Sequence, residues 1–226
     1  MSDAETEQQE EAGQPASLQD TISREAADLM YHLRCSDAPD DVLEEATGHI
    51  RAAMTAMTPW LREGEGWSVL TRAGERAPLD WNLEDLTAVM PYSPVSGKHN
   101  PIAPPLRMWQ EEGAVRGEAL FTPIYAGPPE SVHGGIIAAV FDELLSMANV
   151  VVGSAGFTGS LTIKYHRKTP LNTPVELWAV NELNEGRKQL SRGEMRVNGE
   201  VTASAEGLFI LGAEHKKHNF DGPDAS

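Results

Sequence analysis

Two glycines stand directly before a long apolar segment, in the sequence His133-Gly134-Gly135. The segment that follows, up to about residue 152, is predicted to be a helix. The first amides of a helix have no intrahelical acceptor, the helix dipole adds partial positive charge there, and glycine lets a ligand approach the backbone. Such a position can bind an oxyanion or polarise a carbonyl oxygen. The alternative is that the glycines only allow a tight helix start.

One carboxylate lies inside this apolar helix, at Asp142. Its helical neighbours are Ile136, Ile137, Val140, Phe141, Leu144 and Leu145. Burying a carboxylate there is costly unless it is needed, so Asp142 is a candidate catalytic group. The alternative is a structural hydrogen bond or ion pair. Glu143 points about 100° away around the helix, and we expect it to reach solvent or a partner chain.

The spacing of these groups bears on the assembly. Gly134 and Asp142 are eight residues apart, which corresponds to a rise of roughly 12 Å along one helix. One reacting carbonyl group cannot easily contact both positions. If both serve one reaction, Asp142 must come from a second chain, and the sequence then predicts a symmetric dimer with two sites shared between subunits.

Strand patterns surround the helix and make the fold class α+β. Strands are predicted at residues 106–110, 114–122, 158–167, 174–183, 187–197 and 200–211. The turns between consecutive strands fall at 111–113, 184–186 and Asn198-Gly199, the last a strong hairpin signal. A helix this apolar has to be covered, so we expect an antiparallel sheet to wrap around it.

The N-terminal third has a different character. We expect a disordered acidic tail at residues 1–17, a helical extension at 18–85, the main domain at 86–212 and a flexible tail at 213–226. Within the extension, apolar spacing predicts helices at 18–34 and from 39 or 40 to about 57. Three tryptophans, Trp60, Trp67 and Trp81, either anchor the extension on the main domain or form a lid over a ligand tunnel. A loop with five prolines follows at 90–105.

Charge and composition exclude several classes of protein. The net charge is −16, and residues 1–45 carry 13 acidic and two basic residues, so nucleic-acid binding is not expected. The single cysteine, Cys35, permits no internal disulfide and suits the reducing cytosol, so we expect a cytoplasmic protein. The acidic N-terminus is no secretory signal, and we expect no membrane span. No metal is expected, because His133 has no second ligand at a suitable spacing.

Four segments in the right order resemble the hotdog-fold thioesterases of the PaaI-like group in the thioesterase superfamily. They are SPVSGKHNPIAPPL (93–106), YAGPPESVHGGIIAAVFDE (125–143), TGSLTIKYHRKTPL (158–171) and ASAEGLFIL (203–211). The resemblance implies a hotdog fold, in which a long central helix is wrapped by an antiparallel sheet, here with an N-terminal helical extension. It also implies hydrolysis of an acyl-CoA by a homodimer or a dimer of dimers, with no cofactor.

The resemblance also implies roles for five residues. The amide of Gly134 or Gly135 would polarise the thioester carbonyl, and His133 would shape the loop around it, although a merely structural His133 is the alternative. Asp142 would act as general base on water or as the nucleophile. Thr158 falls where relatives have a Thr or Ser that positions the water or the Asp; the alternative is a hydroxyl at the start of a strand.

Basic residues gather in one part of the sequence and suggest where CoA phosphates bind. Seven bases fall within 33 residues, against four acids. They are Lys164, Arg167, Lys168, Arg187, Lys188, Arg192 and Arg196. The first five are the candidate CoA-binding residues, because an anion needs a local cluster of bases in an acidic protein. The alternative is a solvated sheet edge, where Lys and Arg discourage aggregation.

Two other functions share this fold. One is a hotdog dehydratase or hydratase, which pairs a His and an acid around a double bond. The other is an acyl-CoA-binding module without catalysis. The Asp that follows HGG within the helix favours hydrolysis over hydration, and the acidic residues 1–45 argue against a DNA-regulating sensor.

Overall fold

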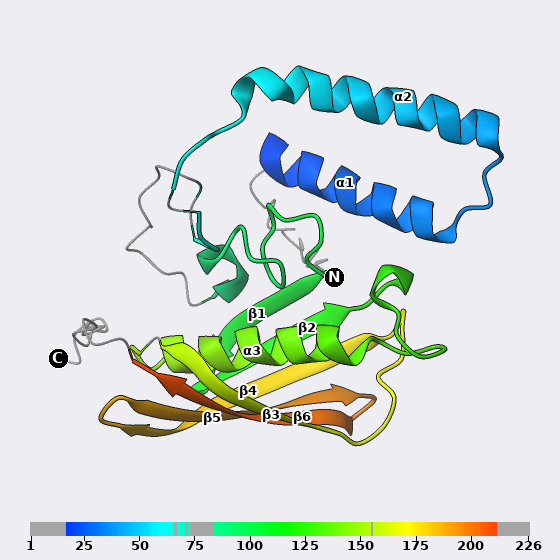
Figure 1. The fold of residues 1–226 in the computed structure, drawn as a ribbon. Coiled ribbons are helices and arrows are strands. Elements are labelled where there is room, and N and C mark those ends of the chain that lie inside the picture. The colour runs from blue at the N-terminus through cyan, green and yellow to red at the C-terminus, as the bar shows by residue number, and fades with distance from the viewer. Residues whose placement is uncertain (1–16, 66, 71, 73–83, 155, 212–226) are drawn as a thin grey trace, which may run out of the picture.

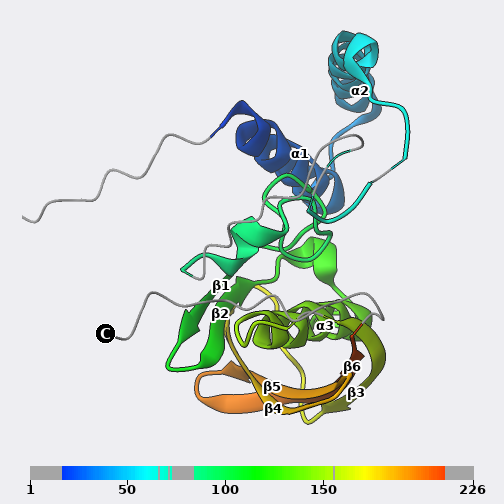
Figure 2. The ribbon, with the colours of Figure 1, turned by 90° about the vertical axis from the view of Figure 1, so that its left-hand side faces the viewer.

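The computed structural model describes residues 17–65, 67–70, 72, 84–154 and 156–211. Its main part is one helix, α3 (Gly134–Val150), on one face of a six-stranded antiparallel sheet of order β1-β2-β4-β5-β6-β3 (Figure 1). The strands are β1 (Leu106–Glu111), β2 (Ala114–Leu120), β3 (Phe157–Tyr165), β4 (Pro174–Glu185), β5 (Lys188–Val197) and β6 (Glu200–Ile210). The sheet curves around α3 (Figure 2), so the predicted hotdog fold is confirmed.

Tight hairpins set the register of this sheet. Both residues of the Glu112-Gly113 turn and both of the Asn198-Gly199 turn have positive φ, between 51° and 77°. Two-residue turns of this kind match the twist of antiparallel strands. The hairpin expected at 184–186 lies one residue later, because Glu185 still pairs with Lys188 and Gly186 takes the positive φ.

The core lies between α3 and the concave face of the sheet. Nine of the 17 residues of α3 are buried, and Phe141, Leu144 and Leu145 have no exposed surface. Two glycines make room for Leu145. A Cβ at Gly193 or at Gly207 would lie within 3.1 Å of its side chain. A larger residue at either position would push α3 away from the sheet.

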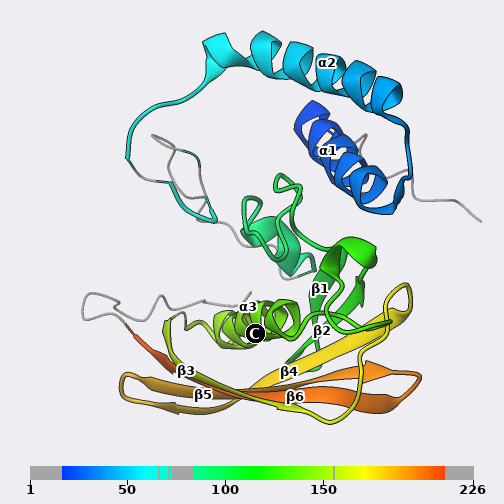
Figure 3. The same cartoon turned by 45° about the vertical axis from the view of Figure 1, so that its right-hand side comes forward.

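Two helices form the extension, as predicted: α1 (Leu18–Cys35) and α2 (Asp40–Met57). Both lie on the side of α3 that faces away from the sheet, with the segment 84–105 between them and the main domain (Figure 3). α2 has no buried residue, and Ser23 is the only one in α1. Short 3-10 helices complete the described elements: η1 (Thr58–Trp60), η2 (Leu86–Val89) and η3 (Pro123–Tyr125).

Two of the three tryptophans, Trp60 and Trp67, do not anchor the extension within one protomer. Trp60 is 84% exposed and Trp67 is 60% exposed, and Trp81 lies outside the described residues. The acidic tail expected at 1–17 also lies outside them except for Ser17, which caps α1, and so does the tail expected at 213–226. None of the helices in the described part of the chain is long and apolar enough to cross a bilayer.

Candidate active site

The loop before α3 leaves one backbone amide without a hydrogen-bond acceptor among the described residues. The Nδ1 atom of His133 accepts a hydrogen bond from the amide of Gly135, at 2.9 Å. The amide of Gly134 donates no hydrogen bond within the described part of the chain. Of the two glycines proposed to polarise a carbonyl oxygen, Gly134 therefore has the free donor, at the positive end of the helix dipole.

Backbone hydrogen bonds hold His133 in place. Its amide donates to the carbonyl of Tyr125, and the amide of Val132 donates to that of Thr169, both at 2.9 Å. Gly127 passes so close that a Cβ there would lie 2.6 Å from the Cα of His133. These contacts fix the position of His133 at the start of α3.

Tyr165, at the end of β3, contacts the open glycine. Its hydroxyl donates to the carbonyl of Gly134 at 2.9 Å, and a Cβ at Gly134 would lie 3.4 Å from that hydroxyl. The sequence analysis placed Tyr165 on a strand without a role in the site. The alternation of Leu161, Ile163 and Tyr165 could have shown that the ring faces the helix.

The predicted pair of Asp142 and Thr158 is brought together. The hydroxyl of Thr158 donates to Oδ1 of Asp142 at 2.7 Å, which links the middle of α3 to the start of β3. The other carboxylate oxygen, Oδ2, has no hydrogen-bond partner among the described residues. A carboxylate held by one oxygen and open at the other can accept a proton from water or attack a carbonyl carbon.

Glu143, next to Asp142, is a partly buried carboxylate. We expected it to reach solvent or a partner chain, and within the protomer it accepts a hydrogen bond from Ser96 of the proline-rich loop. Burial raises its pKa, the hydroxyls of Ser96 and Ser93 offset part of the rise, and the charge of Asp142 adds to it. The sequence carried no signal for this contact, since 47 residues separate the two partners.

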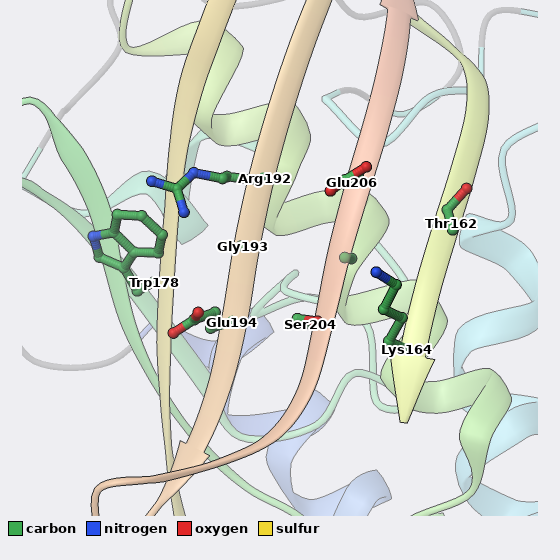
Figure 4. Close-up of a pocket in the computed structure, with 9 residues that line it drawn as sticks. Thr162, Lys164, Trp178, Arg192, Gly193, Glu194, Ser204 and Glu206 are labelled. Atoms are coloured by element: carbon green, nitrogen blue, oxygen red, sulfur yellow. The ribbon is translucent and has the colours of Figure 1, made fainter. Parts of the chain in front are cut away.

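The candidate CoA-binding bases do not form one cluster in the protomer. Lys164 lies on the outer face of the sheet, away from α3, in a shallow hollow that Trp178 and Arg192 also line (Figure 4). Arg192 stacks over Trp178 there, at 5.1 Å. Lys164 is therefore separated by the sheet from the open amide of Gly134 in its own chain.

The other four bases lie at opposite ends of α3. Lys168 donates to the carbonyl of Pro129 at 3.3 Å, beside the loop before Gly134, and Arg167 pairs with Glu200 nearby. Arg187 donates to the carbonyl of Leu211, and Lys188 pairs with Ile210 at the hairpin between β4 and β5. That hairpin lies toward the C-terminal end of α3, because Ser191 of β5 donates to Asn149 at 2.6 Å.

Among the residues that the structure describes, no three His, Cys, Asp or Glu side chains are grouped so as to hold a metal ion. The groups brought together at the site are a backbone amide, a carboxylate and hydroxyl groups.

We compared the chain with known proteins to find its relatives. No family model matches the chain. A solved thioesterase superfamily protein is 33% identical, with a TM-score of 0.74, and the match covers 87% of this chain and 96% of that one. PaaI, a phenylacetic acid degradation protein from Thermus thermophilus, is 20% identical, with a TM-score of 0.44 over 47% of this chain and 93% of its own.

A curated relative matches part of the chain. The acyl-coenzyme A thioesterase THEM4 of Xenopus laevis is 31% identical over 90 residues, which are 39% of this chain and 40% of the relative. The match thus spans less than half of that protein. The similarity to the solved thioesterase superfamily protein, in contrast, extends over nearly all of its length. On that evidence the chain belongs to the thioesterase superfamily.

Proposed function

We propose that this protein hydrolyses acyl-CoA thioesters at two sites, each shared between the subunits of a homodimer. The observation that carries the proposal is the hydrogen bond from Thr158 to Asp142, which leaves Oδ2 of that carboxylate open on the same helix that presents the free amide of Gly134. Membership of the thioesterase superfamily and the similarity to THEM4 support the reaction class.

The edge strand β3 supports the dimer. It pairs only with β6 in the protomer, is nine residues long, and begins with Phe157, which is 73% exposed. An exposed edge of this length is a template for another strand. Two copies of β3 paired antiparallel about a two-fold axis would bring the end of one strand, where Tyr165 contacts Gly134, opposite the start of the other, where Thr158 contacts Asp142.

The reaction follows from this pairing. The amide of Gly134 polarises the thioester carbonyl and stabilises the negative charge that develops on its oxygen. Asp142 of the second subunit takes a proton from water, which adds to the carbonyl carbon, and the intermediate then releases the CoA thiolate. If Asp142 attacks instead, the C–S bond breaks, the CoA thiolate leaves, and the acyl-aspartyl anhydride that forms is hydrolysed by water to the free acid and the aspartate. Thr158 fixes the carboxylate in either case.

The first test measures the release of free CoA from a panel of acyl-CoAs with a thiol reagent. Asp142→Asn keeps the size of the side chain but removes the base, so we expect kcat to fall about 100-fold to 10,000-fold. Glu118→Gln, at an exposed carboxylate on β2, is the matched control and should keep full activity. Hydration of an enoyl-CoA without CoA release, or tight binding without any reaction, would replace hydrolysis with one of the alternative functions.

Gly134 allows an unusually direct test of the amide. Proline at the first position of a helix is favoured and has no N–H group. His133 before it already has an extended conformation, with ψ at 133°, as a residue before proline requires. Gly134→Pro should therefore lower kcat about 100-fold to 1,000-fold while the helix persists. Gly134→Ala keeps the amide and meets only ordinary contacts with Tyr165, so it serves as the control.

Mixing the two inactive variants tests the shared site. A heterodimer of Asp142→Asn and Gly134→Pro chains has one site with both defects and one with none. After subunit exchange, half of the dimers are heterodimers, so activity should recover to roughly a quarter of the wild-type value. No recovery despite demonstrated exchange would mean that each chain holds a whole site.

We also place the protein in the cytosol, where the exposed Cys35 would remain reduced.

A further inference from the structure

We propose that an apolar cavity beneath α1 holds the acyl chain of the substrate and selects aliphatic groups of medium length. The inference rests on the proposed thioesterase function and adds the substrate class. The cavity has a volume of about 370 Å³ and lies between α1, the proline-rich loop, η3 and the first two turns of α3. Residues from all four elements line it, among them Met30, Val95, Ile102, Ile124, Ile136 and Ala139.

Two residues that line the cavity lie next to the proposed carbonyl site. Ile136, which lines it, follows Gly134 by only two residues. Tyr125 lines it too, and its carbonyl accepts the hydrogen bond from the amide of His133, at 2.9 Å. A thioester whose oxygen is held by the Gly134 amide therefore has part of the cavity wall within one turn of the same helix.

The lining indicates the chemistry of the occupant. None of its residues carries a charge, and the one hydroxyl, that of Tyr125, donates to the carbonyl of Ile102 at 3.2 Å. Burial raises the pKa of Tyr125 to about 12, so this hydroxyl stays protonated. A charged or hydroxylated acyl group would lose its hydration without gaining a partner, whereas a hydrocarbon chain would be buried favourably.

The volume sets the length. A cavity of 370 Å³ equals the liquid volume of roughly twelve water molecules, and a methylene group is close to a water molecule in size. We therefore expect the cavity to accommodate an acyl chain of up to about twelve carbons.

The extension acquires a role from this arrangement, because Met30 of α1 forms one wall. α1 is tied to the proline-rich loop by a contact of 3.0 Å between Oδ1 of Asp20 and Nε2 of His99. The loop is in turn tied to α3 by Ser96 and Glu143. The wall is thus held at two points, while the flexible side chain of methionine can adapt to chains of different shape.

The test compares two methionines of the extension. Met30→Trp fills the cavity, and Met54→Trp places the same ring on α2, where the side chain is exposed and lines no part of the cavity. The quantity to measure is the ratio of kcat/KM for dodecanoyl-CoA to that for butyryl-CoA. We expect Met30→Trp to lower this ratio at least tenfold, Met30→Ala to raise the preferred chain length, and Met54→Trp to leave the ratio unchanged.

Binding of decyl-CoA, a thioether that cannot be hydrolysed, separates this inference from the proposed function. Calorimetry should show weaker binding to the Met30→Trp variant than to the wild type, even if no acyl-CoA is hydrolysed. Loss of hydrolysis for every chain length together with chain-dependent binding would overturn the function and keep the cavity. Equal binding to both proteins, or an unchanged kcat/KM ratio, would show that the acyl chain does not enter the cavity, and would overturn the inference.

Discussion

The central helix and the helices of the extension have similar lengths but opposite surroundings. α3 has nine buried residues among 17, whereas α2 has none and α1 has only Ser23. Apolar side chains on the extension remain exposed, for example Ile22, Leu33, Val42, Met54 and Met57. The difference shows that an apolar stripe predicts a helix but does not predict the surface against which that helix packs. The sheet domain holds the fold together, and the extension is free to serve the substrate or a second subunit.

The largest expected difference between the two regions is in stability, and substituting one large apolar residue in each region measures it. Phe141→Ala removes a fully buried ring from α3, so we expect a loss of about 3–5 kcal/mol in the free energy of unfolding. Leu33→Ala on α1, where the side chain is 58% exposed, should cost no more than about 0.5 kcal/mol. Urea unfolding of both variants measures the difference. A cost above about 1.5 kcal/mol for Leu33→Ala would mean that the face of α1 is buried in the oligomer.

The contact between α3 and the proline-rich loop, on which α1 rests, should depend on pH through Glu143. Because its pKa is raised above the ordinary value of 4.5, the folded protein binds a proton that the unfolded chain has already lost. The free energy of unfolding therefore falls as pH rises above 4.5, by at most about 1.4 kcal/mol per pH unit for one carboxyl group. Glu143→Gln keeps an acceptor for Ser96 and cannot ionise, so its stability relative to the wild type should rise over this range.

Thermal unfolding from pH 4 to pH 8 measures this difference. Glu118→Gln, which removes an exposed carboxylate from the same domain, should run parallel to the wild type throughout. A difference between Glu143→Gln and the wild type that stays constant with pH would contradict a buried, ionisable Glu143 at the contact between α3 and the proline-rich loop.

The smallest expected effect concerns the start of the extension. Ser17 caps α1, and its hydroxyl accepts from the amide of Asp20 while the Asp20 carboxylate accepts from the amide of Ser17. Ser17→Ala should destabilise α1 by about 1 kcal/mol, which corresponds to roughly fivefold faster hydrogen exchange of its amides. Amides of α3 should exchange unchanged. Equal acceleration in both helices would show that the extension unfolds together with the sheet domain.

Much of the fold could be predicted from local patterns. The apolar run from Gly134 predicts a central helix, and the paired turns at Glu112-Gly113 and Asn198-Gly199 predict hairpins in register. Errors in the predicted turn positions stayed small because turns depend on local sequence. The hairpin at Gly186, for example, lies one residue later than predicted. The prediction that the candidate bases form one cluster was less accurate. Residues that are close in sequence can lie on different faces of a sheet.

The sequence by itself determined the helix, the succession of strands along the chain and the candidate reactive groups, because spacing and residue type act over a few residues. Only the tertiary structure decided which glycine amide is left free, that β3 pairs with β6, that Ser96 reaches Glu143, and that Met30 of α1 and Ile136 of α3 line one cavity. These features depend on contacts between segments tens of residues apart. Burial and hydrogen-bond geometry in the folded chain select such contacts, and no local pattern encodes them.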